Sequence, residues 1–367
     1  MKLTIGADLV PTQSNIASFE QGDARQLVGD ELLSLLAGAD FRLFNLEVPL
    51  TDRLSPIPKC GPHLSAPERT AAGIVSIGAD LCTLANNHIM DQGAQGLRRT
   101  LELLREKKVR TVGAGETLAQ ALQPVFLEKD GQKVGVYACA EHEFSIAGEN
   151  QPGANPFDPY ESFDHVAALR AQCDYLIVLY HGGKEHYRYP SPGLQKTCRK
   201  LVEKGADLVV CQHSHCIGCE EDYGNGKIVY GQGNFLFDHS EREFWQTSLL
   251  ILVDTQQKQQ VRYVPLRKQG RTVRLAEQQD AAEILEQFLA IVRNRRSRLC
   301  ETAIPEFCAG DARQLLWRLE REHLFHQGAQ PPQRAPVSTG ALFGGEFAGA
   351  AQLCGVRGAQ RAGPGGL

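Results

Sequence analysis

The chain alternates short apolar runs with helical repeats over its first 225 residues, and polar side chains follow five of the apolar runs. Such alternation predicts parallel βαβ units with helices packed on the sheet. The five expected strands, each with the residues that follow it, are 3–5 with Asp8, 41–44 with Asn45 and Glu47, 81–85 with Asn86, Asn87 and His88, 175–180 with His181, and 208–210 with His213 and His215. Because ligands bind beyond the carboxyl ends of strands in α/β sheets, we expect these side chains to converge on one cavity.

Helices are expected between the strands, where apolar residues recur at helical spacing. The five predicted helices are 24–36, 68–77, 97–107, 160–171 and 194–204. After residue 225 the pattern changes, and three runs joined by short polar turns predict an antiparallel second sheet, at 227–230, 247–253 and 261–266. The whole is therefore expected to be a two-sheet α/β sandwich.

The last third of the chain adds helices and a biased tail. Helical spacing over residues 280–298 favours a packing helix with a solvated basic end, and another helix is expected at 311–325. Beyond Gln327 the sequence is rich in Gly, Ala and Pro, which predicts disorder. We expect a catalytic domain over residues 1–275, a helical extension over 276–326 and a tail over 327–367.

Composition limits the partners that the chain can attract. A formal net charge of −4 provides no global attraction to nucleic acid or to anionic membranes, so an anionic substrate must be captured locally. The sequence shows neither a run of about 18 apolar residues nor a signal peptide. Eleven scattered cysteines suit a reducing compartment, so we expect a cytoplasmic protein. The pair Cys216 and Cys219 has no second pair at matching spacing, and a structural or incidental role is favoured over half of a zinc site.

The polar set has the composition of a two-metal hydrolase site. Imidazole nitrogens and carboxylate or amide oxygens suit manganese, iron or zinc. Three histidines, two carboxylates and one asparagine carbonyl, with one carboxylate bridging, would hold two ions about 3.5 to 4 Å apart with room for a bridging hydroxide. His213 and His215 are two residues apart, so on an extended segment they would point the same way and approach one metal centre.

Other residues have more than one interpretation. His88, beside Asn87, could protonate a leaving oxygen, and Asp91 could orient its imidazole or cap a helix. Asp8 could be a ligand, a helix cap or a turn residue. Candidate contacts to substrate are Asn45, Asn86, Glu185, Tyr187 and Asn234.

At this point the motifs resemble a known family. The segments 45–47, 84–88 with Asp91, 181–183 with Glu185, 212–215 and 230–238 are similar to the capsule-synthesis CapA family, also called the poly-gamma-glutamate biosynthesis (PGA_cap) family, which resembles the calcineurin-like metallophosphatases. The similarity covers about residues 1–250. It implies a four-layer αββα sandwich of metallophosphatase type with a dinuclear metal site. The implied ligands are Asp8, Glu47, Asn87, His181, His213 and His215, with His88 as the acid.

Three functional hypotheses follow. The first is a metal-dependent hydrolase, in which a metal-bound hydroxide attacks a small phosphoester or peptide substrate in capsule or poly-gamma-glutamate metabolism. The second is a non-catalytic accessory protein of polymer assembly that binds the anionic polymer in the same pocket. The third takes the metal ions as purely structural.

Overall fold

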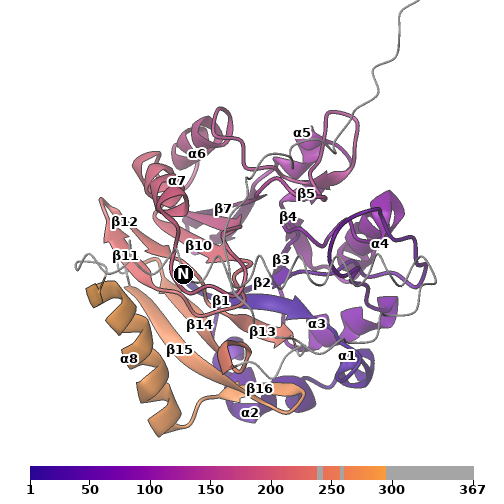
Figure 1. The fold of residues 1–367 in the computed structure, drawn as a ribbon, viewed down its shortest axis with the longest axis horizontal. Helices are drawn as coiled ribbons and strands as arrows, with labels where there is room; N and C mark the ends of the chain where they lie inside the picture. Colours follow the sequence, from indigo (N-terminus) through magenta and orange to yellow (C-terminus); the bar gives the residue numbers. More distant parts are fainter. Residues whose placement is uncertain (238–242, 257–259, 295–367) are drawn as a thin grey trace, which may run out of the picture. The chain divides into compact units, whose positions relative to one another are not determined.

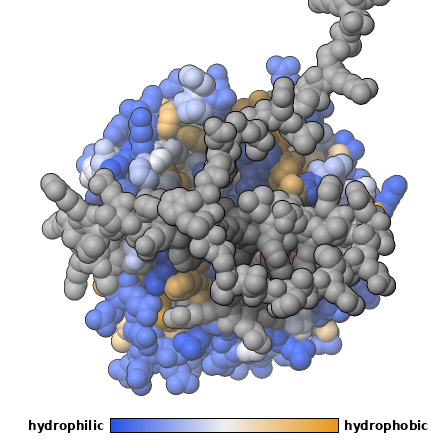
Figure 2. All heavy atoms as spheres, viewed as in Figure 1, coloured by the Kyte–Doolittle hydropathy of each residue, from blue (hydrophilic) through white to orange (hydrophobic). Residues whose placement is uncertain are grey.

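The computed structural model describes residues 1–237, 243–256 and 260–294, all within one compact unit, Met1–Ile304 (Figure 1). The helix predicted at 311–325 and the tail predicted from 327 lie outside the described residues. No helix of the described ranges is long and apolar enough to cross a bilayer. Where Figure 2 colours the surface by hydropathy, hydrophilic side chains predominate and apolar ones lie among them.

The first sheet combines the N-terminal strands with those near residue 250. Its order is β16-β15-β14-β1-β2-β3-β4, and β13 pairs with β1. The parallel members are β1 (Lys2–Val10), β2 (Phe41–Leu46), β3 (Leu81–Thr83), β4 (Arg110–Val112) and β13 (Asn234–Phe237). The antiparallel members are β14 (Thr247–Asp254), β15 (Gln260–Gln269) and β16 (Thr272–Leu275).

The second sheet comes from the middle of the chain. Its order is β11-β12-β10-β9-β7-β6. The strands are β6 (Val125–Lys129), β7 (Gln132–Ala140), β9 (Tyr175–His181), β10 (Leu208–Gln212), β11 (Glu220–Tyr223) and β12 (Gly226–Val229). A separate two-stranded sheet pairs β5 (Ala114–Gly115) with β8 (Gly153–Ala154).

The prediction that the three C-terminal runs form the second sheet is wrong. β12 pairs in parallel with β10, whereas β14 pairs with β1 and extends the first sheet. A period-two pattern identifies a strand, but it does not identify the strand's neighbour. Strands close together in sequence, β14 with β15 and β15 with β16, do pair antiparallel as the pattern predicted.

Alternate residues of β9 enter two different cores, which shows how the layers stack. Ile177 and Leu179 join the core shared with the first sheet, whereas Val178 and Tyr180 join a second core with the helices on the other face. That outer face is covered by α6 (Ser162–Arg170) and α7 (Pro192–Glu203).

The first sheet has helices of its own. They are α1 (Ile16–Gln21), α2 (Ala24–Ala37), α3 (Ala71–Ser76) and α4 (Gly93–Glu106), and all four contribute buried side chains to its core. The predicted four-layer αββα sandwich is confirmed.

Local capping chemistry explains where several helices begin. Asp23 accepts a hydrogen bond from the Gln26 N–H at the start of α2, and Ser191 accepts one from the Leu194 N–H at the start of α7. The helix predicted over 68–77 is divided into a 3₁₀ turn, Glu68–Thr70, followed by α3. The remaining helical elements are α5 (Leu118–Ala121), the 3₁₀ turn Glu243–Trp245 and α8 (Gln278–Asn294), which packs Ile284 and Phe288 against Leu249.

Gly6 allows β1 to pass beneath an aromatic ring. A Cβ atom at this position would lie 2.3 Å from Cδ1 of the buried Phe44, which itself packs on Phe235. Because the ring has no room to withdraw, we expect Gly6→Ala to cost about 1 to 3 kcal/mol of unfolding free energy in urea titrations. The matched control is Gly193→Ala in the first turn of α7, where a Cβ meets nothing closer than 3.8 Å. An equal loss in both variants would contradict this steric explanation.

Candidate metal centre

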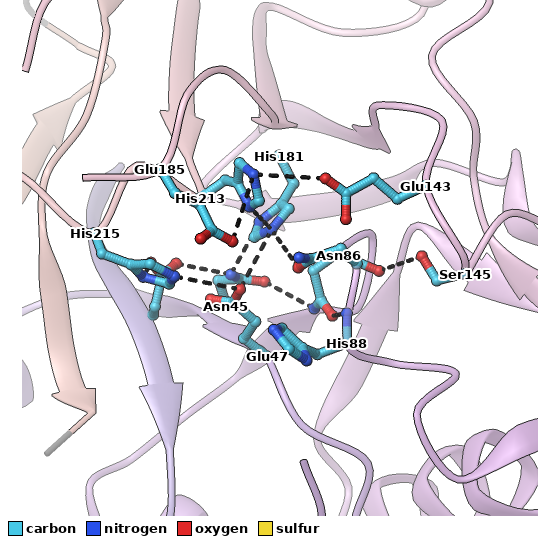
Figure 3. Close-up of polar contacts among 12 residues, drawn as sticks. Asn45, Glu47, Asn86, His88, Glu143, Ser145, His181, Glu185, His213 and His215 are labelled. Carbon is cyan, nitrogen blue, oxygen red and sulfur yellow. Dashed lines mark hydrogen bonds and ion pairs between the residues drawn. The ribbon is translucent and has the colours of Figure 1, made fainter. Parts of the chain in front are cut away.

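The polar residues that follow the five predicted strands meet at one place (Figure 3). Asp8 lies in β1, Glu47 directly follows β2, and His181 ends β9. The convergence predicted from sequence is therefore observed, although the strands belong to two facing sheets, with β9 and β10 in the second. Asp8, Glu47, His181, His213 and His215 are all buried.

Two groups of potential ligand atoms share one carboxylate. Glu47, His181 and His213 form the first group, and Asp8, Glu47 and His215 form the second, with the ligand atoms of each group within 4.8 Å of one another. Hereafter these are the His213 group and the His215 group. Glu47 is the residue that the two groups have in common.

The extended backbone from which we predicted that His213 and His215 approach one metal centre is not observed. Strand β10 ends at Gln212, and both histidines have left-handed backbone, with φ of 97° and 54°. The two-residue period of an extended chain therefore does not apply. Their rings lie 6.2 Å apart and enter different groups. Positive φ is uncommon for residues other than glycine, so this segment is held in a strained form by its surroundings.

Glu47 is the least satisfied polar group of the centre. It is fully buried, and neither carboxylate oxygen has a hydrogen-bond partner among the described residues. Burial, together with the negative charge of Asp8, raises the pKa of Glu47 to about 8 in the metal-free protein. A buried carboxylate without hydrogen-bond partners is costly, and divalent cations would offset that cost. The donor set therefore fits divalent metal.

Burial also keeps two of the imidazoles neutral, which is the form that binds metal. The pKa values of His181 and His213 fall to about 3, chiefly through burial. Nδ1 of His213 lies 3.1 Å from Nε2 of His181, so both nitrogens face the same point. His215 differs: although burial lowers its pKa, the charges of Glu47 and Asp8 raise it to about 9. Its Nδ1 lies 3.2 Å from Oδ2 of Asp8.

Asparagine side chains contact the candidate ligands or one another. Asn45 donates to Oδ1 of Asp8 at 2.8 Å, and Asn86 donates to Oδ1 of Asn45 at 3.1 Å. Both side chains are fully buried and bonded to protein groups, and their predicted contact with substrate stays a prediction. Asn87 presents Oδ1 3.0 Å from Nε2 of His181, beside the His213 group. Asn234 presents Oδ1 2.9 Å from Nδ1 of His215.

The structure excludes a helix-capping role for both aspartates. Asp91 does not cap a helix, because α4 begins after Gln92 and has no side-chain cap. Instead its Oδ2 lies 2.7 Å from Nδ1 of His88. Asp8 lies inside β1, next to a bulge, and is neither a helix cap nor a turn residue.

Two carboxylates lie near Nε2 of His213. Oε1 of Glu143 lies 3.7 Å from its Nε2, and Oε1 of Glu185 lies 4.0 Å from the same atom (Figure 3). Both distances exceed that of a hydrogen bond, so these carboxylates affect His213 through their charge. Tyr187 was predicted beside Glu185 as a substrate contact, which stays a prediction; its ring packs near Tyr189 and Lys184.

Sequence reasoning missed several residues of this region. Glu143 lies between β7 and β8 in a loop without a readable motif. Trp245 packs on His215 with ring centroids 4.9 Å apart, and Lys59 pairs with Asp91 from a loop rich in Pro and Ser. Nothing in the local spacing of these three residues could have identified them. Cys216 and Cys219 are both buried, and no group of potential metal ligands found in the described ranges contains a cysteine.

Comparison with known proteins places these observations in a family. A model described as bacterial capsule synthesis protein PGA_cap matches residues 2–239. The capsule biosynthesis protein CapA of Bacillus anthracis is 31% identical over 182 residues, which is 48% of this chain and 44% of that protein. A probable polyglutamine synthesis accessory protein of Mycobacterium tuberculosis is 29% identical over 230 residues, 57% of this chain and 59% of that protein. The chain spans about half the length of the curated relatives it matches.

Among solved structures, a phosphatase from Mycoplasma pneumoniae aligns with a TM-score of 0.46 at 14% identity, covering 74% of this chain and 94% of that one. The family model covers the whole candidate centre, because residues 2–239 contain every strand that supplies a residue to it. This chain therefore belongs to the bacterial capsule synthesis protein PGA_cap family.

Proposed function

We propose that this protein is a metal-dependent hydrolase of a phosphoester or amide bond in capsule or poly-gamma-glutamate metabolism. The observation that carries the proposal is Glu47, buried without a hydrogen-bond partner in the described ranges and shared by the two groups of ligand atoms. Two divalent ions bound there would supply Lewis acidity and a nucleophile at neutral pH. Manganese, iron or zinc suits the mixed nitrogen and oxygen donors.

The protein's own groups have distinct tasks in this reaction. Asp91 accepts the Nδ1 proton of His88, which leaves Nε2 as the nitrogen available to substrate. With both ring nitrogens protonated, His88 would then donate the Nε2 proton to the leaving oxygen or nitrogen, while Nδ1–H stays bonded to Asp91. Asn45 orients Asp8 through a hydrogen bond, and the negative charges of Glu143 and Glu185 lie near His213.

A second candidate is a non-catalytic accessory protein that binds the anionic polymer. The name of the mycobacterial relative, a probable polyglutamine synthesis accessory protein, favours it. Charge at the opening of the site opposes it, because the side chains of Glu143 and Glu185 are 35% and 46% exposed there. Two partly exposed carboxylates would repel a polyanion.

The experiment compares the wild type with His88→Gln after loading with manganese. We expect about two metal ions per chain in both proteins, by elemental mass spectrometry. Hydrolysis of a phosphodiester with an alkyl leaving group should fall about 10²- to 10⁴-fold in kcat in the variant, because a leaving alkoxide needs the proton that His88 would supply. Equal turnover by both proteins would exclude His88 as the acid.

Binding of labelled poly-gamma-glutamate to the same samples, followed by fluorescence anisotropy, tests the second candidate. Saturable binding without turnover of phosphoester or polymer would replace the hydrolase by the accessory protein. If metal loading raised only the melting temperature, with neither turnover nor polymer binding, the ions would be structural.

A further inference from the structure

A buried lysine lies beside His88 and Asp91. Lys59 comes from the loop of residues 51–65, and its side chain is only 3% exposed. Its ammonium group forms an ion pair with Oδ1 of Asp91 and lies 3.3 Å from Nδ1 of His88. Burying an ammonium group is costly unless it is paired. The structure thus places a fixed positive charge directly on the carboxylate that contacts His88.

Backbone contacts hold this loop against the turn that carries Asp91. The Leu64 N–H donates to Oδ2 of Asp91 at 2.6 Å, and the Ile57 N–H donates to the Asp91 carbonyl at 3.1 Å. The next residue, Gln92, accepts from the Ser55 N–H at 2.8 Å. Because these bonds flank Lys59 on both sides, its position is set by the backbone of the loop.

The three contacts determine which atom holds the proton. Oδ2 of Asp91 lies 2.7 Å from Nδ1 of His88, and an ionised carboxylate can only accept, so Nδ1 carries a hydrogen. Nδ1 then cannot accept a hydrogen bond from Lys59. Lys59 therefore affects His88 through Asp91: it occupies Oδ1, while His88 and the Leu64 N–H occupy Oδ2.

We propose that Lys59 is a positioning residue, which locks the Asp91 carboxylate in the orientation that keeps the Nδ1 proton of His88 in place. The loop 51–65 is then part of the site through its contacts with Asp91 and His88. The consequence for catalysis rests on the proposed hydrolase function. The hydrogen bond itself does not, and the two can be tested separately.

Proton NMR tests the hydrogen bond without any substrate or metal. A short imidazole N–H to carboxylate bond gives a resonance far downfield of the amide region, and we expect one that disappears in His88→Gln and in Asp91→Asn. In Lys59→Met this resonance should shift or be lost through exchange with water. The same substitution at an exposed lysine, Lys107→Met, should leave it unchanged. An unshifted resonance in folded Lys59→Met would overturn the proposal.

Thermal melting covers the case in which Lys59→Met folds poorly. This variant leaves the Asp91 carboxylate buried without its counter-charge, whereas Lys59→Met combined with Asp91→Asn removes both charges. We expect the double variant to melt at a higher temperature than Lys59→Met alone. If the two substitutions lowered the melting temperature additively, Lys59 would not act through Asp91.

Kinetics then connects the hydrogen bond to the proposed function. With an active wild type, Lys59→Met should lower kcat about 10- to 100-fold, with KM and metal content unchanged. The double variant should lose no more activity than Asp91→Asn alone, and a further loss would assign Lys59 a separate role. An inactive wild type with the NMR shift intact would refute the hydrolase proposal and leave the positioning role standing.

Discussion

Replacing His213 by alanine is expected to remove one of the two proposed metal ions and to abolish the proposed hydrolysis while the fold survives. His213 contributes to only one group of ligand atoms, whereas Asp8, Glu47 and His215 form the other group and stay intact. Loss of a direct ligand should lower the affinity of the His213 group for metal by more than the roughly 10- to 100-fold typical of losing a residue that only contacts a ligand. Elemental analysis should then give about one ion per chain, and phosphodiester turnover should fall by more than about 100-fold.

Matched variants separate ligand loss from other effects. His213 has left-handed backbone, which alanine tolerates poorly, so His213→Asn should give the same metal loss with less strain. His215→Ala should remove the other ion, and His165→Ala, on α6 in the outer helical layer, should remove none. Two ions retained in His213→Ala would refute the assignment of the His213 group. Unfolding of both His213 variants would favour structural metals.

Much of this site could be predicted because it lies at strand ends. A buried strand is recognisable as an apolar run, and the residue that follows it is fixed within one or two positions. Asp8, Glu47 and His181 were placed by that logic, and the structure brings them together. The four-layer fold followed from the resemblance of the motifs, since periodicity alone could not tell that β14 extends the first sheet.

The rest of the site depends on loops, whose geometry no local pattern encodes. His213 and His215 were expected to share one metal because an extended chain was assumed, yet their backbone is left-handed. Lys59 reaches Asp91 from 32 positions earlier in the chain, through hydrogen bonds that depend on the folded loop. Glu143 lies near His213 but comes from the loop between β7 and β8, about 70 positions earlier in the chain. Such contacts between distant segments are specified by the tertiary structure.

Glu47 links the stability of the protein to its metal content. In the metal-free state the folded carboxyl has a pKa of about 8, against an ordinary value of 4.5. Below pH 4.5 the Glu47 carboxyl is protonated in both the folded and the unfolded state, so its ionisation does not lower the free energy of unfolding there. Between pH 4.5 and about 8 the unfolded state releases its proton first, and stability therefore falls as pH rises. Above about pH 8 the full cost of burying the charge remains.

Glu47→Gln is accordingly expected to have opposite effects with and without metal. Without metal at pH 7.5 the variant should be more stable than the wild type by on the order of a few kcal/mol, a gain that disappears below pH 4.5. The charge of His215, which partly compensates Glu47, limits the gain.

With excess manganese the order should reverse, because only the wild type keeps the shared ligand and gains stability from bound ions. Thermal melts at pH 4 and 7.5, with and without manganese, measure all four values. Glu149→Gln, an exposed carboxyl between β7 and β8, should match the wild type throughout. If Glu47→Gln destabilised the metal-free protein at pH 7.5, the carboxylate would be satisfied by the protein itself, and the main argument for a metal centre would fail.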